Sequence, residues 1–102
     1  MNAAIAAQQP ELIKLCRTFH VQRLELFGSA LSSGFEPDRS DLDFLVEFEL
    51  LPAGVYANTF FGFREALEHL FGRPVDLVVA SAIRNPYFRQ SIEQAKALLY
   101  AA

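Results

Sequence analysis

Apolar residues recur along this chain at two spacings, and the helical spacing appears three times. An apolar residue every three or four positions predicts a helix. The first such stripe follows Pro10, a residue suited to a first helical turn, and consists of Leu12, Leu15, Cys16 and Phe19. The second consists of Phe60, Phe63, Leu67, Leu70 and Phe71. Asn85-Pro86 predicts the capped start of a last helix, with inward positions Phe88, Ile92, Ala95 and Leu99.

Short apolar runs between these helices predict three strands, over residues 24–27, 42–48 and 75–79. Pro52 and Gly54 separate the second strand from the next helix, and Gly72 and Pro74 end that helix. The expected architecture is a small α+β domain, with one sheet and helices packed on one face. Residues 1–102 form a single domain in this interpretation, and the Ala- and Gln-rich residues 1–9 are expected to be a frayed extension.

The junction of the first two strands carries the candidate chemistry. Gly28-Ser29 ends the first strand, and its backbone N–H groups and hydroxyl suit a phosphate. Asp41 and Asp43 open the second strand and point to the same face, because side chains alternate along a strand. Two adjacent carboxylates repel each other unless a cation lies between them, and oxygen ligands suit Mg²⁺. A phosphate site beside a Mg²⁺ site indicates a nucleoside triphosphate.

A third acidic residue, Asp76, interrupts the apolar run of residues 75–79. The run leaves two interpretations open, because Asp76 is either solvated on an edge strand or placed beside the first two carboxylates. We favour the second, since it completes the three-acid cluster that two-metal phosphoryl transfer requires. Arg39 lies two residues before Asp41, and its guanidinium matches phosphate oxygens, which makes it a candidate nucleotide ligand.

The bulk composition limits the partners. The formal net charge is −3, whereas a nucleic-acid binder typically has a basic surface, so we do not expect a nucleic-acid partner. No apolar run approaches a membrane span, and the N-terminus has no signal-like pattern, so we expect a cytoplasmic protein without membrane contact. The single cysteine, Cys16, has no partner for an internal disulfide and is expected in the core.

These motifs resemble the minimal nucleotidyltransferases (MNT) of the polymerase-beta-like superfamily. The resemblance runs from about Leu12 to Tyr100, through "LFGSALSSGFEPDRSDLDFLVEFE", "LFGRPVDLV" and "AIRNPYFRQSIEQAKALLY". It implies that the sheet is mixed and that the acids lie on its uncovered side. It also implies an enzyme that uses two Mg²⁺ ions and transfers AMP from ATP.

The same resemblance suggests a role for each candidate residue. Gly28 and Ser29 hold the triphosphate, and Asp41 and Asp43 hold the metals. Asp76 completes the second metal site and helps to deprotonate the acceptor hydroxyl. Stand-alone members are commonly antitoxins encoded beside a HEPN-domain ribonuclease toxin, to which they add AMP on a tyrosine. The implied function is therefore that of an antitoxin acting by AMPylation.

Two other functions remain open at this point. Many family members carry an Arg shortly after Gly-Ser, whereas residues 30–34 here read Ala-Leu-Ser-Ser-Gly. This difference favours an antitoxin that neutralises its toxin by complex formation with weak or no catalysis. An adenylyltransferase that modifies a small molecule is the other alternative, although such enzymes usually add a helical domain for which 102 residues leave no room.

Overall fold

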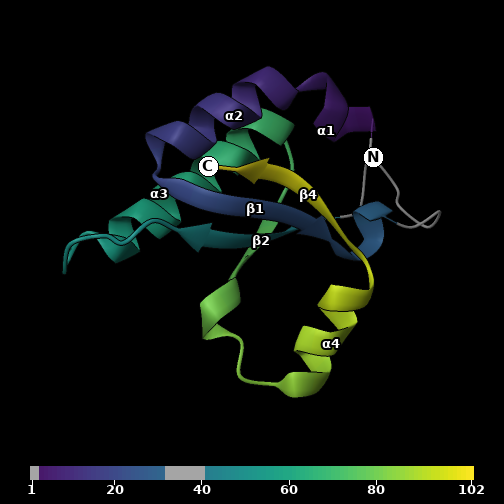
Figure 1. Ribbon diagram of the computed structural model, residues 1–102. Coiled ribbons are helices and arrows are strands. Elements are labelled where there is room, and N and C mark those ends of the chain that lie inside the picture. The colour runs from purple at the N-terminus through teal and green to yellow at the C-terminus, as the bar shows by residue number, and fades with distance from the viewer. Residues whose placement is uncertain (1–2, 32–40) are drawn as a thin grey trace.

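The computed structural model describes residues 3–31 and 41–102 (Figure 1). Its helices are α1 (Ala3–Ala7), α2 (Gln9–Thr18), α3 (Tyr56–Phe71) and α4 (Pro86–Gln94), with 3-10 turns η1 (Gly28–Leu31) and η2 (Ala80–Ala82). Its strands are β1 (Val21–Phe27), β2 (Leu42–Phe48), β3 (Val75–Val79) and β4 (Lys96–Ala101). The bounds of β2 and β3 are those predicted, while β1 begins at Val21 rather than at Leu24.

The described strands form one four-stranded sheet in the order β3-β2-β1-β4. β1 is antiparallel to both β2 and β4, whereas β2 and β3 are parallel. A parallel pair needs a crossover connection, and α3 supplies it between β2 and β3. The prediction of a small α+β domain with a mixed sheet is therefore confirmed.

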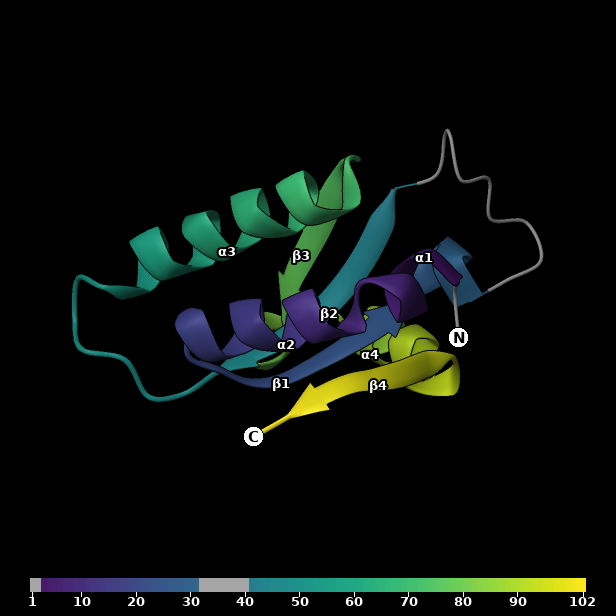
Figure 2. The ribbon, with the colours of Figure 1, turned by 90° about the horizontal axis from the view of Figure 1, so that it is seen from above.

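The main hydrophobic core lies between the sheet and helices α1, α2 and α3, which cover the same face (Figures 1 and 2). Alternate strand residues point into this core, as strand geometry requires. The strands contribute Leu24, Leu26, Leu42, Phe44, Val46, Val75 and Leu77. The helices contribute Ile5, Leu12, Cys16, Phe63 and Leu67. Burial raises the pKa of the Cys16 thiol to about 12, which fits its expected place in the core.

The N-terminal residues differ from expectation where they are described. Instead of a frayed extension, residues 3–7 form α1, and Ile5 is fully buried in the main core. Alanine has the highest helix propensity, and burial of Ile5 in the main core stabilises a helix that is too short to be stable alone.

The last predicted helix is too long, because it stops at Gln94 and the chain continues as β4. Ala95 leaves the helical region with φ of −150°, and residues 96–101 then pair with the free edge of β1. Ala95 and Leu99, predicted as inward positions of this helix, therefore lie at its C-cap and in β4, where Leu99 is buried in the main core. Strand pairing overrides local helical spacing in so short an apolar run.

Helix α4 packs against the other face of the sheet, so the prediction that the helices cover one face holds for α1, α2 and α3 only (Figure 1). Its one buried residue, Ile92, joins Phe27 and Leu45 in a second, smaller cluster. Val78 and Ile83 pack against the edge of this cluster. The sheet therefore has a thick apolar core on one face and, on the other, a small apolar cluster under one helix.

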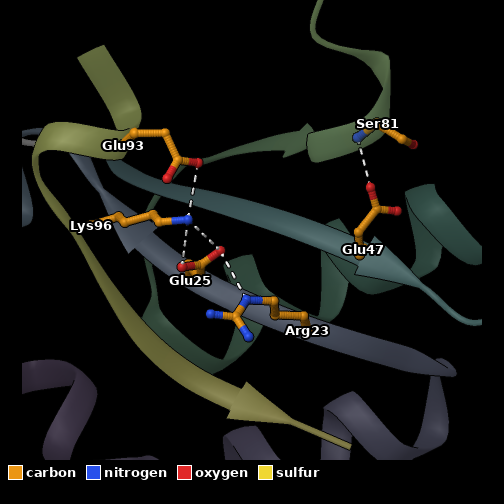
Figure 3. A network of polar contacts seen from close by, with 6 residues as sticks. All are labelled: Arg23, Glu25, Glu47, Ser81, Glu93 and Lys96. Carbon is orange, nitrogen blue, oxygen red and sulfur yellow. Dashed lines mark hydrogen bonds and ion pairs between the residues drawn. The ribbon is translucent and has the colours of Figure 1, made fainter. Parts of the chain in front are cut away.

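An ion-pair network fastens the junction of α4 and β4 to the sheet (Figure 3). Lys96 Nζ lies 3.1 Å from Glu25 Oε2 and 3.1 Å from Glu93 Oε1, and Arg23 Nε lies 3.2 Å from Glu25 Oε1. The Glu93 carboxylate, helped by Glu25, raises the pKa of the Lys96 ammonium. The nearly buried Glu25 is thereby compensated by two cations of the chain itself.

Candidate active site

Asp43 and Asp76 are register partners on the parallel strands β2 and β3. Neighbouring strands lie about 4.8 Å apart, so the two residues are adjacent on the sheet. By alternation, Asp43 points to the same face as Leu45, and Asp76 to the same face as Val78, which is the face that α4 covers in part. Two sequence-predicted acids are thus brought together, on the face opposite α1–α3.

The electrostatic environment of Asp43 is set by burial and by other acids. Burial raises the pKa of the half-buried Asp43 carboxyl, and the negative charges of Asp76 and then Asp41 raise it further. Asp41 is exposed and lies two residues earlier, on the same face by alternation. The other two predicted acids therefore both act on Asp43, whose position disfavours negative charge unless a cation or a proton is present.

Gly28 brings the backbone after β1 against the Asp43 carboxylate. Phe27 pairs with Asp43 across the strands, and Gly28 then turns away with a φ of 76°. A Cβ at Gly28 would overlap Asp43 Oδ2, so the turn requires glycine for space as well as for its left-handed backbone. The turn that the sequence suggested for phosphate therefore lies directly beside one of the predicted metal ligands.

Ser29 and Arg39 are the remaining predicted nucleotide ligands, and the structure describes only the backbone of Ser29. Ser29 follows Gly28 in η1, so its backbone belongs to the same turn. Arg39 falls within residues 32–40, outside the described part of the chain.

The carboxylates do not form a complete metal cage by themselves. Among residues 3–31 and 41–102, no three His, Cys, Asp or Glu side chains form a group that could hold a metal ion. The paired carboxylates nevertheless fit Mg²⁺, because this ion usually takes one or two carboxylates and completes its shell with substrate phosphates and water. The donor set therefore suits an ion that arrives with a nucleotide.

Sequence reasoning missed two features of this face. One is Glu25, an acid within the apolar run of β1, which gives the same signal as Asp76 but is neutralised by Arg23 and Lys96. The other is the position of α4, whose aromatic residue Phe88 contacts Phe27 next to the acids. No local pattern indicates which sheet face a helix covers.

Comparison with known proteins identifies the class. The family model described as a nucleotidyltransferase domain matches residues 10–99. The chain therefore belongs to the nucleotidyltransferase domain family and is a nucleotidyltransferase. A Methanocaldococcus jannaschii protein, provisionally named a protein adenylyltransferase, is 38% identical over 74% of each chain. Protein adenylyltransferase MntA from Thermococcus cleftensis is 36% identical over 71% of this chain and 69% of its own.

Solved structures give the same result for the fold. A structure provisionally described as a minimal nucleotidyltransferase superimposes with a TM-score of 0.71 at 29% identity, covering 90% of this chain and 89% of that one. A toxin–antitoxin structure with AMP-PNP gives 0.67 at 21% identity, over 92% and 73%. A tri-AMPylated Shewanella oneidensis HEPN toxin in complex with its MNT antitoxin gives 0.65 at 20% identity, over 95% and 72%. The resemblance to minimal nucleotidyltransferases is confirmed.

No helix within the described residues is both long and apolar enough to cross a membrane.

Gly28→Ala tests the contact between the turn and Asp43. A positive φ alone costs an L-residue about 1–2 kcal/mol, and overlap with the carboxylate should add at least about 1 kcal/mol. The matched control is Gly72→Ala, because Gly72 has a φ of 65° and a Cβ there would meet nothing within 4 Å. Urea unfolding of both variants measures the difference.

The extra loss should disappear when Gly28→Ala is combined with Asp43→Ala, since the overlapping carboxylate is then gone. If both glycine variants lose the same stability, or if the double variant is simply additive, the turn does not press on Asp43.

Asp43→Asn should stabilise the fold at neutral pH. The folded state raises the pKa of Asp43 above its unfolded value of about 4, so the ionised carboxylate lowers the free energy of unfolding. The gain should be full above the folded-state pKa, shrink as pH falls through it, and vanish below the unfolded pKa. Thermal melts in EDTA between pH 3 and 8 measure it, with exposed Glu65→Gln on α3 as the control. A variant less stable than wild type at neutral pH would mean that the carboxylate is a favourable structural group.

Proposed function

We propose that this chain is a Mg²⁺-dependent enzyme that transfers AMP from ATP to a hydroxyl, that of a tyrosine, on a partner HEPN toxin. It would thereby act as the antitoxin. The observation that carries the proposal is the Asp43–Asp76 pair beside the Gly28 turn, in a chain of the nucleotidyltransferase family. Relatives named as protein adenylyltransferases and the AMPylated toxin complex support the choice of nucleotide and acceptor.

Each residue has a distinct role in this proposal. The backbone of Gly28 and Ser29 would hold the triphosphate, with Arg39 as a further phosphate ligand. Asp41, Asp43 and Asp76 would hold two Mg²⁺ ions, Asp76 completing the second site. The bound metal would offset the charge that the carboxylates and the phosphates share. The AMP-PNP present in a structural neighbour supports ATP as the donor.

The reaction would be an in-line displacement at the α-phosphorus. The acceptor oxygen forms the new P–O bond while the bond to pyrophosphate breaks, and pyrophosphate leaves with the electron pair. Asp76 would take the hydroxyl proton, a role supported by its position on β3, one strand further from the Gly28 turn than Asp43. The chain's main contributions would be positioning and the arrangement of charge.

A protein acceptor suits the surface of the chain better than a nucleic acid. The net charge of −3 disfavours a polyanionic partner. A cytoplasmic location, where ATP is abundant, goes with this proposal.

The proposal predicts that the HEPN product of a neighbouring gene gains AMP when incubated with this chain, labelled ATP and Mg²⁺. The Asp41→Asn, Asp43→Asn double variant should add none. Asp76→Asn should lower the transfer rate by at least ~10²-fold, the scale of a lost acid–base contribution, while ATP affinity changes little. Intact-mass measurement of the toxin and a nucleotide titration give these values.

A second function, neutralisation by complex formation alone, is favoured by one observation, the absence of Arg from residues 30–34. Under this alternative the double variant would protect against the toxin as well as wild type, and the toxin would gain no mass. That pair of results would replace the enzymatic proposal.

A further inference from the structure

The first turn of α4 is held in a fixed position. Asn85 Oδ1 accepts hydrogen bonds from the backbone N–H groups of Tyr87, at 2.9 Å, and Phe88, at 3.2 Å. Pro86 occupies a first-turn position of the helix, where its locked φ fits. Arg89 Nη2 donates to the Ile83 carbonyl at 2.8 Å and ties the turn to the preceding loop. Phe88 is therefore carried by an anchored backbone.

The Phe88 side chain packs on the strand that borders the acids. Its ring lies 6.2 Å from that of Phe27, centroid to centroid, at an interplanar angle of 74°. Phe27 is almost buried and is the register partner of Asp43, whereas Phe88 remains 41% exposed. The neighbouring Tyr87 is 81% exposed. An exposed aromatic ring in a fixed orientation thus lies near the acids.

The ring and the acids lie on the same face of the sheet. Phe27 and Leu45 share the small cluster under α4, and Asp43 has the same side-chain direction as Leu45. One cross-strand step of about 5 Å and the contact between the two rings separate Phe88 from Asp43. One nucleotide can therefore reach from the Gly28 turn to the Phe88 ring.

The geometry points to Phe88 as the stacking platform for the purine base of the nucleotide, with Tyr87 beside it. The inference rests on the proposed function, and it assigns base recognition to α4. An exposed ring gains from being covered by another flat apolar surface, and base–aromatic stacking contributes about 1–3 kcal/mol. Stacking recognises the area of a base rather than its hydrogen-bonding edge. We therefore expect a preference for purines over pyrimidines without strict selection of one purine.

Calorimetric titrations in Mg²⁺ test the assignment, using ATP, CTP and inorganic triphosphate as probes. Phe88→Leu keeps an apolar contact with Phe27 but removes the ring, so ATP should bind about tenfold more weakly. Inorganic triphosphate, which has no base, should bind to Phe88→Leu with wild-type affinity. The preference for ATP over CTP should decrease. Phe88→Tyr should retain wild-type ATP affinity.

Phe61→Leu is the matched control, because Phe61 is a 51% exposed aromatic on α3, which covers the opposite face. Its ATP affinity should not change. Independently of any variant, a photoreactive ATP analogue activated on the base should label the wild-type peptide that contains Tyr87 and Phe88.

The assignment is overturned by unchanged ATP affinity in Phe88→Leu, by equal losses for ATP and triphosphate, or by labelling of α3 instead of α4. A Phe88→Leu variant that affects only the KM for a protein acceptor would likewise overturn it, assigning the ring to acceptor binding. Because these titrations need no acceptor, they separate the two proposals. If wild type binds ATP but transfers no AMP, the enzymatic function alone fails, and if it binds no nucleotide, both fail.

Discussion

The repulsion between two carboxylates held in register is the constraint on which the functional face depends. Backbone pairing of β2 with β3 places Asp43 beside Asp76, and the strands cannot separate them without losing the sheet. Burial is the largest cause of the raised pKa of Asp43, and the negative charges of Asp76 and Asp41 raise it further. The backbone of Gly28 packs directly against the Asp43 carboxylate and leaves no room for a side chain at position 28. Such an arrangement costs stability in the free protein, and a cation brought by a nucleotide would relieve it.

Comparison with Glu25 shows why this pair suggests function and not only structure. Glu25 is also an acid on the α4 face of the sheet, and it is more deeply buried. The fold supplies it with Arg23 and Lys96, both within 3.2 Å. Asp43 has a different environment, since the two side chains that shift its pKa are both acidic. Glu25 and Asp43 lie on neighbouring strands and on the same face of the sheet. They differ in that the chain itself provides compensating positive charge for Glu25.

Much of the fold follows from local patterns, and the exceptions have a common physical cause. Residues 42–48 and 75–79 are short, mainly apolar runs, which predicted β2 and β3, and strand geometry predicted the shared direction of Asp41 and Asp43. Apart from Lys96, residues 96–101 are a short apolar run whose spacing suits a helix as well as a strand, and pairing with the free edge of β1 makes it β4. The register that pairs Asp43 with Asp76 likewise depends on how β2 and β3 align, which the local sequence of either strand does not specify.

The placement of α4 also depends on tertiary structure. Phe88 and Ile92 form an ordinary apolar stripe, and this stripe would suit a helix on either face of the sheet. Which face they meet depends on the crossover through α3 and on the return of β4 to β1. The contribution of Arg39 stays a prediction from sequence, since residues 32–40 lie outside the described part.

If the carboxylate pair holds a metal, nucleotide binding should depend on a divalent cation. Calorimetric titration of ATP into the wild-type chain, in Mg²⁺ and in EDTA, tests it most directly. We expect measurable affinity in Mg²⁺ and its loss in EDTA, with the Asp41→Asn, Asp43→Asn double variant no longer responding to Mg²⁺. Equal ATP affinity in Mg²⁺ and in EDTA would contradict the account, because the carboxylates would then have no part in holding a metal.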